Sequence, residues 1–110
     1  MSWIHNREYY RITYPNALRP KLLVQGHTFE VVDLCERGIR FTLGDAIPPD
    51  VGYEMQGTVR FRRGETVEVR GTILRLNDGE IAARLDAGIP LRAIMEEQRF
   101  LLDRRRHLGI

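Results

Sequence analysis

The stretch that decides the fold is TFEVVDLCERGIRFTL, residues 28–43. Apolar side chains alternate with others through TFEVVDLC, which is the period of a β-strand. CERG is a turn sequence, and RGIRFTL then resumes the alternation. The stretch therefore predicts a β-hairpin. One face of its first strand is expected to carry Phe29, Val31, Asp33 and Cys35, and the other face Val32 and Leu34.

Four further segments with the same period lie on either side of this hairpin. They are KLLVQ (21–25), EMQGTVRFRR (54–63), ETVEVRGTILRL (65–76) and EIAARLD (80–86). In the third segment the apolar face changes side near Gly71, which predicts a bulge or corner there. Five or six antiparallel strands, each with one apolar face, indicate a mainly β fold, a small barrel or strongly curved sheet over residues 21–87.

The two ends of the chain break this pattern. In residues 1–20, Pro15 and Pro20 would interrupt a helix or a central strand, so this segment is expected to be a flexible, irregular arm. After Pro90 the period changes to that of an α-helix, predicted over residues 90–108. The helix is expected to cover the barrel with an apolar stripe of Leu91, Ile94, Met95, Gln98, Leu101 and Leu102.

The composition indicates a soluble globular protein, because 43% of the 110 residues are apolar and 29% are charged. This length suits one domain, residues 1–110. The first residues, MSWIHNREYYR, contain no apolar run like that of a signal peptide, and no window approaches the roughly 20 apolar residues of a membrane span. We therefore expect a cytoplasmic protein that does not insert into membranes.

Few residues offer catalytic or metal chemistry. Cys35 is the sole cysteine, which excludes an internal disulfide and a cysteine-built zinc site. His5, His27 and His107 are far apart and show no ligand spacing, so no metal is expected. The sequence contains no P-loop, no zinc-protease motif and no nucleophile elbow. We expect a protein that is not an enzyme and that uses no cofactor.

Asp33 and Cys35 are unusual in a buried strand. A cysteine in this setting commonly acts as a small hydrophobic side chain. A buried carboxylate has to be paired or hydrogen-bonded, because desolvating it alone costs several kcal/mol. Since Asp33 is close to the strand end, it could instead cap the backbone donors of residues 36–38. Local features leave both alternatives open.

A second feature is REYYR, residues 7–11, in which Arg7 and Arg11 are four positions apart with two tyrosines between them. Two guanidinium groups on a flexible arm suit the binding of phosphates and the stacking on purine rings. Sixteen of the seventeen basic residues are arginine, which a compositional bias of the source genome explains better than a function does. The position of an arginine is therefore more informative than the number.

Together the two features form a known signature. R-x-x-x-R near the amino terminus, followed about twenty residues later by [DN]-x-S-x-x-G at a strand end, is typical of PilZ domains, bacterial receptors for cyclic di-GMP. The sequence resembles this family through Arg7, Arg11, Asp33 and Gly38, through GTILR at residues 71–75, and through EIAARLD before the helix. The resemblance implies a six-stranded antiparallel barrel of the PilZ type with a C-terminal helix.

The resemblance also implies a ligand site, whose residues would be Arg7, Arg11, Asp33, Cys35 and Gly38. The arginines would take phosphates and guanine, while Asp33, beside Cys35, would accept from guanine N1 and N2. Gly38 would permit a positive φ and a close backbone approach. Binding would order the arm and so change the surface that a partner protein meets.

Two positions depart from the family pattern. Cys35 stands where serine is usual, and one lost neutral hydrogen bond is worth about 0.5–1.5 kcal/mol, or up to roughly tenfold in affinity. Asn6 stands where many members have a basic residue before the first motif arginine. We expect binding to survive both changes.

Two other functions fit parts of the sequence. A PilZ-like module without nucleotide could dock a partner through its barrel or through the arginines at 104–106, although cations are also favoured at a helix C-terminus for its dipole alone. A barrel that binds RNA or DNA would use Trp3, Tyr9 and Tyr10 as stacking platforms. The net charge of only +2 argues against such a nucleic acid polymer.

Overall fold

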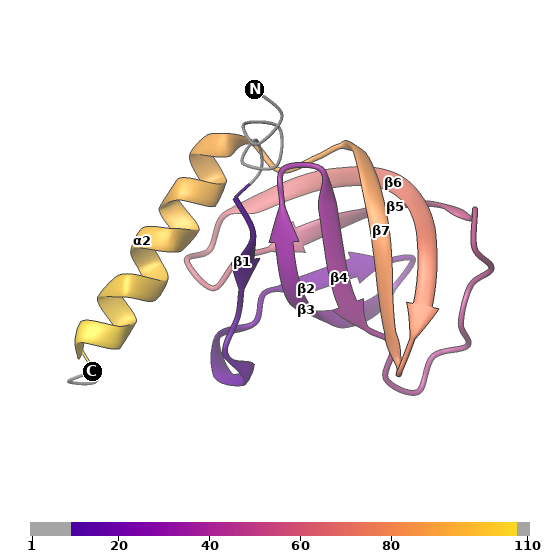
Figure 1. Ribbon diagram of the computed structural model, residues 1–110, viewed down its shortest axis with the longest axis horizontal. Coiled ribbons are helices and arrows are strands. Elements are labelled where there is room, and N and C mark those ends of the chain that lie inside the picture. The colour runs from indigo at the N-terminus through magenta and orange to yellow at the C-terminus, as the bar shows by residue number, and fades with distance from the viewer. Residues whose placement is uncertain (1–9, 108–110) are drawn as a thin grey trace, which may run out of the picture.

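The computed structural model describes residues 10–107. Its elements, in chain order, are β1 (Ile12–Thr13), the 3-10 helix η1 (Asn16–Leu18), β2 (Lys21–Val24), β3 (His27–Cys35), β4 (Gly38–Thr42), β5 (Glu54–Arg60), β6 (Thr66–Asn77), β7 (Glu80–Ala87) and α2 (Leu91–His107). Figure 1 shows the strands curling into a barrel, with α2 on its outside next to β1. Within the described range no helix is long and apolar enough to cross a membrane.

Six of the strands between residues 10 and 107 close the barrel. Their order is β2, β3, β4, β7, β6 and β5, and β5 returns to pair with β2. All of these pairs are antiparallel. The expected mainly β fold, a six-stranded antiparallel barrel with a C-terminal helix, is confirmed. The bulge expected near Gly71 is also present, as a register shift between Arg70 and Gly71 in the pairing with β7.

Side chains from all six barrel strands fill the interior. These inward residues are apolar and at most 3% exposed, and they include Leu22, Val31, Phe41, Val59, Val69 and Ile81. A barrel of so few strands is narrow enough for its own side chains to fill it. The barrel interior formed by the described strands is therefore a packed core.

The segment before β2 is more ordered than expected. β1 pairs with β3 at the edge that β2 leaves free, with Thr13 opposite Asp33. Ile12 and Tyr14 are only 3% and 4% exposed. The prediction of an irregular arm through residue 20 is therefore wrong for this part of the chain. The free edge of β3 that attracts β1 is a tertiary feature, which local sequence does not show.

The helix is rotated relative to the predicted stripe. Leu91, Met95 and Leu102 are 45%, 42% and 53% exposed, so this part of the stripe faces away from the barrel. The buried side chains are Ala93, Ile94 and Glu97, each at most 1% exposed. A buried glutamate has to find hydrogen-bond donors, and the partners of Glu97 lie on the barrel side of the helix.

Glu97 joins three parts of the chain. It accepts a hydrogen bond from the Tyr14 hydroxyl at Oε1 and one from Arg63 Nε at Oε2, both 2.5 Å long. Tyr14 follows β1, and Arg63 lies in the turn between β5 and β6. Burial, with the hydrogen bond to Glu97, raises the pKa of the Tyr14 hydroxyl. The contact therefore fastens the segment around β1 to α2.

Alkaline unfolding tests this contact. Because folding raises the pKa of Tyr14 above its usual value of about 10, the unfolded chain loses this proton first as the pH rises. The free energy of unfolding should then fall, from this group, by about 1.4 kcal/mol for each pH unit above that value. Urea denaturation between roughly pH 9 and 11 should show a shallower decline in Tyr14→Phe than in the wild type.

The matched control for this experiment is Tyr53→Phe, which removes a hydroxyl from a ring that is 46% exposed. That variant should keep the decline of the wild type. Identical declines in the wild type and in Tyr14→Phe would contradict the buried contact with Glu97.

Candidate functional site

A β-bulge in β3 decides where Asp33 points. Val31 lies opposite Phe41 and Asp33 lies opposite Arg40, so the register shifts by one residue between them. A bulge reverses the alternation of faces along a strand. Leu34, at 1% exposure, therefore joins Val31 in the core, while Asp33 faces the outside of the barrel. The predicted shared face of Val31 and Asp33 is wrong.

Asp33 is covered by two arginines, although it lies on the outer face. Its side chain is only 3% exposed. Arg11 Nη1 donates to Asp33 Oδ1 at 3.1 Å, and Arg40 Nη2 donates to Oδ2. Of the two alternatives left open by the sequence, the paired carboxylate is therefore the one observed. The side chain of Arg11 is 65% exposed, so this arginine is also accessible from the solvent.

A row of cross-strand neighbours extends from Asp33 over the outer face. Its members, from β1 to β6, are Thr13, Asp33, Arg40, Ala82 and Arg75. Residues directly opposite each other in a sheet share a face. Arg40, Ala82 and Arg75 of this row line a polar hollow of about 270 Å³. The hollow is also lined by Asn77, Asp78 and Glu80.

The neighbouring row contains Cys35 and Gly38. Cys35 is two residues beyond Asp33 with no further register shift, so the expected placement of both side chains on one face is confirmed. Gly38 lies between Cys35 and Arg84. Its φ is not positive, so the positive φ expected there is wrong. The reason is that residues 36–37 make the turn, and Gly38 is already the first residue of β4.

The second role expected of Gly38, a close backbone approach, is compatible with the structure. A Cβ at this position would stand on the outer face, 3.4 Å from Cys35 Sγ. Without that carbon, the backbone of β4 remains accessible between Cys35 and Arg84. The close backbone approach expected of this glycine is therefore sterically available.

Two backbone hydrogen bonds fix the hairpin turn beside Gly38 to the end of β7 and the segment that follows it. Glu36 O accepts from the Ile89 amide at 3.0 Å, and Arg37 O accepts from the Leu85 amide at 2.9 Å. A Cβ on Gly88 would lie 1.9 Å from Glu36 O, so the chain can pass this close only because residue 88 is glycine. The turn is thus a rigid support for the face that carries Asp33 and Cys35.

The fold brings together four of the five residues expected to bind the ligand, Arg11, Asp33, Cys35 and Gly38. Arg7, the fifth, lies outside the described residues. The sequence interpretation missed the arginines that surround them, namely Arg40, Arg75 and Arg84. Arg40 could have been found, because the predicted two-residue turn of the CERG hairpin already places residue 40 opposite residue 33. The other two required the register of β7 and β6.

Comparison with known proteins supports the fold. No family model matches the sequence, and no curated protein matches it. Among solved structures, the Bacillus subtilis inhibitor of motility, MotI/DgrA, superposes with a TM-score of 0.60 at 17% identity, covering 94% of this chain. The chain spans about half, 52%, of that protein.

A second structure, an uncharacterized protein of Legionella, gives a TM-score of 0.59 at 13% identity. Here the match covers 88% of this chain and 98% of the other. At these identities the likeness establishes a shared fold. The site residues therefore have to be argued from their own geometry.

The pairing of Asp33 can be tested by removing Arg40. Arg40→Leu should lower the free energy of unfolding by about 1–3 kcal/mol, because it leaves one oxygen of a buried carboxylate without its charged donor. Arg75→Leu is the matched control, since Arg75 lies in the same row without contacting Asp33, and it should change stability by no more than about 0.5 kcal/mol. Urea denaturation at neutral pH measures both. Equal effects of the two variants would contradict the pairing.

Proposed function

We propose that this chain is a non-catalytic bacterial receptor for cyclic di-GMP. The observation that carries the proposal is the contact between Arg11 and Asp33, which are 22 positions apart in sequence and 3.1 Å apart in space. These are residues of the two separate motifs by which the sequence resembles PilZ domains. Cys35 and Gly38 adjoin them on the same outer face.

The chemistry of this face suits a guanine nucleotide. An ionised carboxylate offers about four acceptor positions, and two arginines occupy only part of this capacity at Asp33. Guanine N1 and N2 donors can therefore share the carboxylate once Arg11 moves. Arginine forks match both the phosphates and the O6 and N7 edge of guanine. The arginines of the outer face thus complement the charge of a cyclic dinucleotide.

The proposed signal is an exchange of partners. Without nucleotide, Arg11 is paired with Asp33. When guanine takes Asp33, Arg11 turns to the nucleotide, and the arm that carries it is ordered over the ligand. Because Tyr14, three residues further on, is hydrogen-bonded to Glu97, the rearrangement would reach α2.

We propose that a downstream protein recognises this altered surface and that the receptor acts in the cytoplasm. One protein of similar fold is named an inhibitor of motility, which agrees with a regulatory role. Neither a nucleic acid polymer nor membrane insertion forms part of the proposal.

One observation favours a second candidate, a PilZ-like interaction module that binds no nucleotide. Both oxygens of Asp33 already accept from arginines of the same chain. In that case the motif would be structural, fastening the arm to the barrel, and the outer face would dock a protein directly. The two candidates differ in whether cyclic di-GMP competes for Asp33.

Isothermal titration with cyclic di-GMP separates the candidates. The wild type should bind with micromolar or tighter affinity, and Arg11→Ala should abolish binding by removing a phosphate and guanine partner. Cys35→Ser should retain the affinity or improve it by up to roughly tenfold, because a hydroxyl is a better hydrogen-bonding group than a thiol.

Two controls accompany the titration. Arg62→Ala removes an exposed arginine in the turn between β5 and β6 and should bind as the wild type does. GTP should give no comparable heat. Absence of heat with cyclic di-GMP would favour the nucleotide-independent module, and unchanged affinity of Arg11→Ala would refute the assignment of the arm.

A further inference from the structure

The end of the barrel where β3 begins contains a second cavity, of about 450 Å³. Its floor is formed by Phe41, Met55, Ile73 and Ile81, each at most 4% exposed. Its rim is formed by the start of β3 and by the loop of residues 43–53. We call this space the mouth cavity. Its volume lies within the roughly 300–1,000 Å³ of small-molecule sites in proteins.

The loop over this cavity exposes apolar side chains. Ile47, Val51 and Tyr53 are 91%, 62% and 46% exposed. Both ends of the loop are fixed, because the amides of Leu43 and Gly52 each donate to a backbone carbonyl at 2.8 Å. Apolar side chains gathered at the edge of a hollow are typical of a binding surface. A loop fixed at both ends can present them without folding first.

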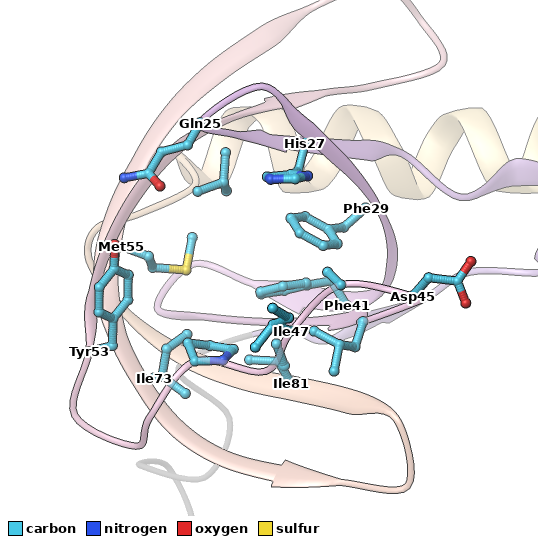
Figure 2. A pocket seen from close by; sticks show the side chains of 14 residues that line it. Gln25, His27, Phe29, Phe41, Asp45, Ile47, Tyr53, Met55, Ile73 and Ile81 are labelled. Atoms are coloured by element: carbon cyan, nitrogen blue, oxygen red, sulfur yellow. The ribbon is translucent and has the colours of Figure 1, made fainter.

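Aromatic rings line two sides of the mouth cavity (Figure 2). The ring centroids of His27 and Phe29 are 6.2 Å apart, and those of Phe29 and Phe41 are 5.4 Å apart, with tilted planes. Tyr53 stands on the opposite side, next to the thioether of Met55. Rings at such separations accept a further ring edge-to-face or offset, and a thioether adapts its shape to an aromatic neighbour.

The core below the cavity limits the shape of a ligand. Leu22, Val31 and Val59 fill the barrel interior and have no exposed surface, at 0% each. An acyl chain that reached below the cavity floor would have to displace them. A short, flat molecule needs only the space between the rings. The geometry therefore favours a compact aromatic ligand over an aliphatic chain.

Polar groups occur only around the rim. Gln25 and His27 stand at its edge, whereas the Asp45 carboxylate points away from the rings (Figure 2). An amide and an imidazole can both donate and accept hydrogen bonds. We propose that the mouth cavity binds a planar aromatic molecule with one hydrogen-bonding substituent. The ring lies between Phe29 and Tyr53, and the substituent meets Gln25 and His27.

This site is independent of the proposed nucleotide site. The two lie at opposite ends of β3, which begins at His27 beside the mouth cavity and ends at Cys35 beside the hairpin turn. A protein that fails to bind cyclic di-GMP can still bind an aromatic ligand at the mouth. The two proposals therefore stand or fall by separate measurements.

The test is a titration of methyl-labelled protein with naphthol, followed by NMR. The reporters are the methyl groups of residues lining the cavity, namely Ile47, Met55, Ile73 and Ile81. The references are isoleucines elsewhere in the chain, namely Ile12, Ile39, Ile89 and Ile94. Naphthol should shift the reporters in a saturable way and leave the references in place. Decanol, an aliphatic alcohol with the same number of carbon atoms, should bind at least about tenfold more weakly.

Two variants locate the binding. Phe29→Leu removes a half-buried ring and should weaken naphthol binding about tenfold, whereas Phe100→Leu, the same change on α2, should not alter it. Ile47→Asp places a charge at a residue that is 91% exposed, so it should weaken binding without affecting folding.

Three results would overturn the proposal. The first is the absence of saturable shifts at the reporters. The second is decanol binding as tightly as naphthol, and the third is equal shifts at the reporter and reference methyl groups.

Discussion

The outer face of this barrel depends on the carboxylate of Asp33, which would cost several kcal/mol to bury without its arginine partners. Arg40 supplies one partner from the adjacent strand and Arg11 supplies the other from the segment before β1. The bulge in β3 makes this arrangement possible, because it turns Asp33 away from the core. A strand without the bulge would direct the charge into the barrel, where apolar side chains offer no donors.

The two arginine partners of Asp33 differ in how firmly other contacts hold them. Arg40 is also within 3.5 Å of Glu80 and is held in a row of strand residues. Among residues 10–107, Arg11 makes one hydrogen bond, and its side chain is 65% exposed. In the proposed function, Arg11 would therefore act as the switch, and Arg40 would preserve the site.

The two ends of β3 lie beside surfaces of different chemistry, one charged and one apolar. The far end of β3, with its turn fastened by the carbonyls of Glu36 and Arg37, presents charged groups. The near end opens into the apolar mouth cavity. Between them the interior is closed by packed side chains, so ligands at the two ends would not meet. Besides β3, β4 connects the two regions, because it carries Arg40 beside Asp33 and Phe41 in the floor of the cavity.

Much of the fold was predictable, because alternation of apolar residues is a local signal that strands of this length preserve. The hairpin around CERG and the helix after Pro90 both follow from it. β1 was not predictable in this way, because two residues form a strand only where β3 offers a free edge. The face of Asp33 was missed for a similar reason. A bulge adds one residue to a register, and nothing in VVDL marks which valine is extra.

The helix face shows a different limit. Leu91 and Met95 fit an apolar side of the helix, yet both are exposed, whereas Glu97 is buried. Its partners, Tyr14 and Arg63, come from distant parts of the chain, so the preference for a buried acid is visible only in three dimensions. The residues of the candidate site were easier to predict from the sequence than the buried face of the helix. The proximity of Arg11, Asp33, Cys35 and Gly38 was predictable from motif spacing, and the structure adds Arg40 as the second arginine that pairs with Asp33.

The most direct test of the central claim, that cyclic di-GMP competes with Arg11 for Asp33, is an NMR titration of the amide resonances with that nucleotide. If the nucleotide competes with Arg11, the amide resonances of Arg11, of Asp33 to Gly38 and of Arg40 should shift. Smaller shifts should occur around Glu97, through the contact with Tyr14. Resonances that stay unshifted at these positions in the presence of saturating nucleotide would contradict the account and leave the Arg11–Asp33 pair as a purely structural contact.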